Sequence, residues 1–120
     1  MCILAPQVEG AIRDLCVLCG DATVKLNQDK TEEYLGLDGL LKQAKINECI
    51  DEKLLFNLNM IFTSVYGFNM RNRVAHGIMD DEDFTLVDCF FTWWFVLRLC
   101  IEFTNFKYRH IKTILNKIKE

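Results

Sequence analysis

Residues 89–97 are apolar almost without interruption, so a helix built from them has no polar face to turn toward water. A helix that is apolar all round must be covered all round. A membrane span is one solution, but Asp88 and Arg98 bracket a stretch far shorter than the ~20 residues that a spanning helix needs. We therefore expect a long helix over residues 83–105, covered by the domain's own core on one side and by a second subunit on the other. The residues expected at that dimer interface are Trp93 and Trp94.

Hydrophobic periodicity predicts a first helix from Pro6, which a first helical turn tolerates, to Cys19, with Gly20 as its stop. The pattern fades over residues 21–37, where polar residues dominate and predict a surface loop with room for a short turn of its own. A short helix capped by Asp38 is then expected to run to about residue 48.

Asp51 is expected to cap a further helix, whose apolar residues follow helical spacing as far as Val65 and end at Gly67. The acidic residues 80–83 place negative charge where the aromatic helix would begin, which favours its dipole. A length of 120 residues and a content of 51% hydrophobic and 26% charged residues are typical of one globular domain. The expected fold class is all-α, a bundle of four or five helices that dimerises through the long aromatic-rich helix.

One of the chain's two histidines lies in residues 69–77, close to a guanidinium and an amide. If Asn69 caps a helix here, Asn72 and His76 lie one turn apart on one face, and the long side chain of Arg71 can reach the imidazole. Histidine titrates near neutral pH, whereas arginine stays charged and fits phosphate oxygens, so the set suits phosphodiester chemistry. Structural roles also fit: the amide holds a neighbouring helix, the arginines are solvated and the histidine ends a helix.

Residues 71–76 resemble the signature of the HEPN superfamily, which has an Arg, a polar residue directly after it and a His four to six residues beyond the Arg. The longer stretch 67–77 is similar to one branch of unknown function, marked by Arg-Asn, three residues and then His-Gly. An apolar helix before the motif and an aromatic-rich helix after it extend the similarity over most of residues 3–106. The resemblance implies an all-helical dimer that is often a metal-independent endoribonuclease. It also implies one HEPN-like domain over residues 1–120, a C-terminal fragment of a longer parent protein.

By the same resemblance, the catalytic residues would be Arg71, Asn72 and His76. His76 would act as general acid or base on the ribose 2′-hydroxyl or the leaving 5′-oxygen, Arg71 would stabilise charge on the phosphorane, and Asn72 would position a neighbour or a phosphate oxygen. One chain has one motif histidine, so the acid and the base would come from both copies at a composite dimer site. Two other classes stay open: a non-catalytic HEPN-like nucleotide-binding, nucleic-acid-binding or dimerisation module, and a membrane-associated accessory domain. A cognate inhibitor is a further possible partner.

The net charge of -3 gives no overall attraction to RNA, so binding would depend on a local basic patch. Between Asn105 and Lys119 the chain has no acidic residue, and its cations alternate with apolar residues at helical spacing. This segment predicts a basic amphipathic helix that lines a phosphate path or lies on an anionic membrane, while a docked helix with solvated lysines fits equally well. The expected RNA-binding residues are Arg73, Lys107, Arg109, Lys112 and Lys117.

The chain has six cysteines but no recognisable signal peptide, which favours a reducing cytoplasm over a secreted disulfide scaffold. Cys16 and Cys19 form a C-x-x-C pair that could supply half of a zinc site. No second pair follows at zinc spacing, and the amphipathic setting favours small core residues. We therefore expect no metal and no cofactor.

Overall fold

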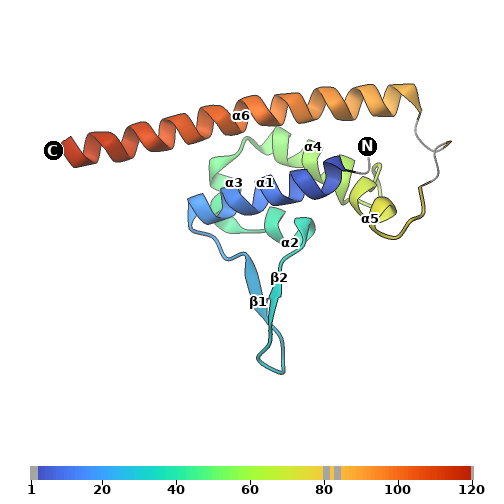
Figure 1. Ribbon diagram of the computed structural model, residues 1–120, viewed down its shortest axis with the longest axis horizontal. Helices are drawn as coiled ribbons and strands as arrows, with labels where there is room; N and C mark the ends of the chain where they lie inside the picture. The colour runs from blue at the N-terminus through green and yellow to red at the C-terminus, as the bar shows by residue number, and fades with distance from the viewer. Residues whose placement is uncertain (1–2, 80–81, 83–84, 120) are drawn as a thin grey trace. The chain divides into compact units, whose positions relative to one another are not determined.

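The computed structural model is mostly helical and describes residues 3–79, 82 and 85–119 (Figure 1). It divides into two compact units, Met1–Asp83 and Phe84–Glu120. The elements in chain order are α1 (Leu4–Cys19), β1 (Val24–Leu26), β2 (Glu32–Tyr34), α2 (Leu37–Leu41), α3 (Ala44–Cys49), α4 (Glu52–Phe62), α5 (Met70–Ala75) and α6 (Leu86–Lys119). Within the described part of the chain, no helix is long and apolar enough to cross a membrane.

The core of the first unit lies between α1 and the shorter helices α2, α3 and α4. The predicted first helix is confirmed, although it starts two residues earlier than expected. Its buried face repeats every three or four residues and comprises Ala5, Val8, Ile12, Leu15 and Cys16. Gly20 ends it in the left-handed conformation, with φ 79°, as a C-terminal glycine commonly does. The core also contains buried residues of α2, α3 and α4, among them Leu37, Leu40, Ile46, Leu54, Leu58 and Phe62.

The expected surface loop over residues 21–37 is exposed or half-buried as far as residue 36, but it contains a β-hairpin, and Leu37 is buried as the first residue of α2. Strands β1 and β2 pair antiparallel, with Val24 opposite Tyr34 and Leu26 opposite Glu32. The backbone N–H of Asn27 donates to the carbonyl of Thr31 at 2.9 Å and closes the turn. All six strand residues are exposed, so the alternation of apolar and polar residues that reveals a half-buried strand is missing.

The single short helix expected from Asp38 to about residue 48 is wrong, because two helices occupy this stretch. Gly36, not Asp38, is the N-cap of α2, and Asp38 lies in its first turn, where it pairs with Lys42. Gln43 has an extended backbone conformation and separates α2 from α3. Asp21, directly after α1, accepts hydrogen bonds from the first backbone amides of α3, at 2.7 Å from Ile46. A distant carboxylate therefore starts this helix.

Asp51 caps α4 as predicted, because its carboxylate accepts hydrogen bonds from the backbone amides of the first turn. The helix ends at Phe62, so its expected continuation to Gly67 is wrong, and Val65 is 75% exposed. The chain then folds back, and the amide of Phe68 donates to the carbonyl of Met60 at 3.0 Å. A Cβ atom at Gly67 would lie 1.9 Å from that carbonyl oxygen, so only glycine fits there.

The aromatic helix begins later and ends later than the expected residues 83–105. Thr85 accepts a hydrogen bond from the amide of Asp88 and donates to its carboxylate, a reciprocal cap that starts α6 at Leu86. The helix continues for 34 residues to Lys119, so the basic terminal segment is its C-terminal part and not a separate helix. Three residues of the acidic run, Asp80, Asp81 and Asp83, lie outside the described residues.

The close approach of Gly67 to the Met60 carbonyl predicts that any larger residue at position 67 destabilises the fold. Gly67→Ala should lower the free energy of unfolding by about 1–3 kcal/mol or more, because backbone must move to accept the methyl group. Gly10 is the matched control, since a Cβ atom there meets nothing within 4 Å in the middle of α1. Gly10→Ala should stabilise by about 0.5–1 kcal/mol. Urea unfolding measures both, and an unchanged stability of Gly67→Ala would contradict the packing.

Candidate functional site

Helix α5 carries the motif and is only six residues long. Met70 anchors it in the core, 2% exposed, while the following motif residues are partly exposed. Asn69 occupies the N-cap position but does not cap with its side chain, contrary to expectation, because it adopts the left-handed conformation with φ 49°. Its side-chain oxygen instead accepts a hydrogen bond of 2.8 Å from the amide nitrogen of Asn72. The Asn72 side chain is therefore oriented by Asn69 through its nitrogen and by Arg71 through its oxygen.

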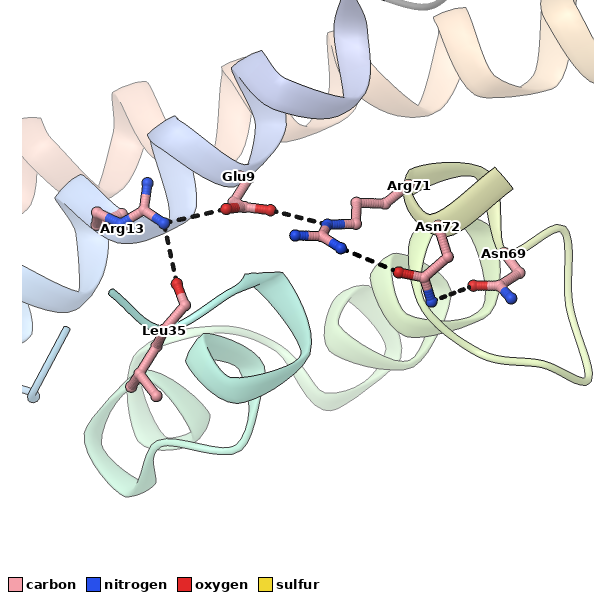
Figure 2. Close-up of polar contacts among 6 residues, drawn as sticks. All are labelled: Glu9, Arg13, Leu35, Asn69, Arg71 and Asn72. Atoms are coloured by element: carbon pink, nitrogen blue, oxygen red, sulfur yellow. Dashed lines mark hydrogen bonds and ion pairs between the residues drawn. The ribbon is translucent and has the colours of Figure 1, made fainter. Parts of the chain in front are cut away.

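The side chain of Arg71 points toward Glu9 on α1 (Figure 2). Its Nε donates to Glu9 Oε2 at 3.1 Å, and its Nη1 donates to Asn72 Oδ1 at 3.1 Å. The other carboxylate oxygen of Glu9 binds Arg13 at 3.0 Å, and Arg13 also donates to the carbonyl of Leu35 at 2.9 Å. One chain of polar contacts therefore joins α1, α5 and the residue between β2 and the N-cap of α2.

Two arginines hold the carboxylate of Glu9 in its charged form. Its side chain is only 17% exposed, and this burial by itself opposes ionisation. Hydrogen bonds from Arg13 and Arg71, together with their charges, outweigh burial and place the pKa of Glu9 below its usual value. The carboxylate is thus ionised at neutral pH, and its single negative charge is shared between Arg13 and Arg71.

His76 is the C-cap of α5, and its side chain is exposed. Its backbone N–H donates to the carbonyl of Asn72, and the amides of Gly77 and Ile78 donate to Val74 and Arg73. Gly77, with φ 62°, closes the helix in the left-handed conformation. Among the residues that the structure describes, no hydrogen bond or ion pair engages the His76 imidazole. The structure therefore brings Arg71 and Asn72 together but does not place the guanidinium on His76.

A pocket of about 350 Å³ opens beside the Glu9–Arg71 ion pair. Its polar lining comes from Glu9, Arg13 and Arg71, and its apolar lining comes from Ala5, Pro6, Val74 and Ala75. Sequence reasoning missed Glu9 and Arg13, because neither lies near the motif. The available signal was a Glu and an Arg four residues apart on an amphipathic helix, and this spacing more often indicates a surface ion pair.

The other expected site residues are distributed over both units. Arg73 lies on α5, whereas the cations expected to bind RNA through the basic segment, Lys107, Arg109, Lys112 and Lys117, are exposed on α6. The two residues expected at a dimer interface, Trp93 and Trp94, are 53% and 52% exposed. A dimer interface at these tryptophans stays a prediction.

The cysteines of the C-x-x-C pair lie at the end of α1. Cys16 is buried, and burial raises the pKa of its thiol to about 11. Burial, followed by a hydrogen bond with Cys49, raises the pKa of Cys19 to about 12. Over residues 3–79, 82 and 85–119, no three His, Cys, Asp or Glu side chains gather closely enough to hold a metal ion. The thiols are thus protonated at neutral pH and behave as small apolar groups.

Comparison of the chain with known protein families, curated proteins and solved structures found no match. The resemblance to HEPN proteins therefore rests on the motif residues and their surroundings in this sequence. A function for the chain must be argued from these residues and their geometry.

The ion pair at Glu9 predicts a pH-dependent contribution to stability. A carboxylate whose pKa is lowered on folding stabilises the protein above its unfolded pKa, near 4.5, and this contribution is lost as the pH falls through the folded pKa. Glu9→Gln should therefore destabilise by about 1 kcal/mol at pH 7, with a difference that shrinks below pH 4.5. Asp38→Asn, which removes an exposed pair with Lys42, is the control and should change little. A Glu9→Gln effect that is the same at pH 3 and pH 7 would contradict this assignment.

Proposed function

We propose that this chain is an RNA-cleaving domain of the HEPN type, in which His76 transfers protons and Arg71 stabilises negative charge on phosphate. The supporting observation is that an exposed histidine ends α5 one turn after Arg71 and Asn72, whose side chains are fixed to each other by a hydrogen bond. An exposed imidazole can reach a polymeric substrate, and histidine is the residue type that most often transfers protons in catalysis.

The proposed reaction is transesterification at a phosphodiester. A base removes the proton from the ribose 2′-hydroxyl, the 2′-oxygen attacks phosphorus, and an acid protonates the departing 5′-oxygen. Negative charge grows on the phosphate oxygens during this step, and a guanidinium held nearby stabilises it. Nε and Nη1 of Arg71 are used by Glu9 and Asn72, which leaves the donors of Nη2 for a phosphate oxygen.

The reaction needs one base and one acid, whereas α5 provides a single histidine. The second proton-transfer group would be His76 of another copy at a composite site, so the active species would be a homo-oligomer. RNA would be held by Arg73 and by the exposed cations of α6. The pocket beside Glu9 and Arg71 offers space for a nucleotide next to the guanidinium.

A second candidate is a non-catalytic HEPN-like module that binds nucleic acid or assembles proteins. The observation that favours it is the double pairing of Arg71, since a guanidinium that binds both Glu9 and Asn72 also serves to fasten α5 to α1. The two candidates differ in whether RNA is cut.

Cleavage by purified full-length chain in excess EDTA tests the proposal. Loss of a general acid or base commonly costs ~10²- to 10⁴-fold, so His76→Ala should nearly abolish cleavage of single-stranded RNA. Arg71→Ala should also lose most activity, and circular dichroism must show that each variant stays folded. His110→Ala is the matched control, since it removes the chain's other histidine from outside the motif. Equal loss in His110→Ala, or full activity in His76→Ala, would refute the assignment.

RNA affinity should depend on the cations of α6 and not on cations in general. The double variant Arg109→Glu, Lys117→Glu should bind single-stranded RNA more weakly and with a flatter dependence on salt, because fewer counterions are released. Lys53→Glu, an exposed charge reversal on α4, serves as the control and should bind normally. Fluorescence anisotropy at several salt concentrations measures both effects, and an unchanged salt slope in the double variant would exclude α6 as the RNA-binding surface.

A further inference from the structure

Helix α6 carries an apolar seam along its whole length that the proposed function does not use. Its members follow one another at alternating intervals of three and four residues, and they are Val87, Phe90, Trp94, Leu97, Ile101, Thr104, Tyr108, Ile111, Leu115 and Ile118. All ten side chains are exposed, and the nine apolar ones have exposed fractions between 43% and 76%. This seam follows the heptad spacing of a coiled coil.

An exposed seam of this length requires a partner helix. A helix of 34 residues is about 51 Å long, and the heptad interval keeps all ten seam residues in line for one helix of similar length. Contiguous apolar surface on this scale marks an interaction site in soluble proteins. The residues that flank the seam decide which partner fits.

The flanking charges fit a second copy in the opposite direction. Toward the C-terminal end, the flanks carry Lys107 and Lys112, whereas toward the N-terminal end they carry Phe91 and Trp93. In a parallel pair, Lys107 would lie opposite the partner's Lys112, and two basic halves would repel each other. In an antiparallel pair, Lys112 lies opposite the partner's Phe91, so the basic half of each helix meets the aromatic half of the other.

Side-chain size agrees with the same direction. With Ile101 opposite the partner's Thr104, every seam position has a counterpart and each aromatic residue faces an aliphatic one. Trp94 then faces the partner's Ile111, and Leu97 faces the partner's Tyr108. A parallel pair would instead stack Trp94 on the partner's Trp94, and Thr104 on the partner's Thr104. Layers of even volume pack with fewer voids than alternating crowded and empty layers.

We propose that α6 forms an antiparallel coiled coil with α6 of a second copy of this chain, in the register that places Ile101 opposite the partner's Thr104. The pairing rests on α6 alone and not on the proposed RNA cleavage. The paired seam contains no residue of α5, so association and cleavage can be lost separately.

Disulfide trapping in the full chain tests direction and register together. Phe90 and Leu115 face each other only in the antiparallel register, and within one helix they are about 37 Å apart, too far for an internal bridge. A mixture of Phe90→Cys and Leu115→Cys proteins should therefore form a 90–115 bridge between copies under mild oxidation, identified by peptide mass spectrometry despite the native cysteines. Asn116→Cys, exposed next to Leu115 but off the seam, is the matched control and should not bridge to position 90.

Sedimentation provides the second measurement. The wild-type chain should be at least a dimer at micromolar concentration, and Ile101→Glu should weaken its association at least ~10-fold, whereas Asn116→Glu should not. Bridges from 90 to 90 or from 115 to 115 would overturn the antiparallel direction. A monomer that forms no bridge would overturn self-association through the seam. If the chain forms the 90–115 bridge but cleaves no RNA, the proposed function is refuted and the α6 pairing still holds.

Discussion

The ion pair between Glu9 and Arg71 is the contact on which the motif's geometry depends. It joins α1 to α5 across 62 residues of sequence, and without such tertiary contacts a helix of six residues is not stable in water. Arg71 in turn orients Asn72, whose amide nitrogen binds Asn69. The same ion pair keeps the guanidinium in place and offsets part of the positive charge around it. It therefore has both a structural and a chemical role.

Local signals in the sequence predicted those helix ends that depend on a single residue next to the helix. Asp51 and Gly20 act as a cap and a stop through backbone contacts within their own turn, which a sequence can reveal. The break before α3 was not predictable, because its first amides are satisfied by Asp21, which lies after a different helix. The early end of α4 depends likewise on the tight return at Gly67, where the chain packs against Met60.

The geometry of the candidate site was only partly predictable from the sequence. The sequence placed Arg71, Asn72 and His76 on one short helix; in the structure Arg71 and Asn72 lie within α5, and His76 is its C-cap. It could not reveal that Arg71 turns toward Glu9, since that partner is remote and carries no motif of its own. Helix α6 shows the opposite case: its apolar stretch was evident, but the charge change after Asn105 suggested a boundary where the backbone continues without a break.

The most direct test of the central claim is to identify the ends of the RNA that the folded chain produces in excess EDTA. Mass spectrometry of a short single-stranded RNA should show a 2′,3′-cyclic phosphate on the upstream fragment and a 5′-hydroxyl on the downstream fragment, because the 2′-oxygen is the nucleophile. Products with a 5′-phosphate would mean that water or another nucleophile attacks instead. Intact RNA with a well-folded, associated chain would contradict the catalytic role of His76.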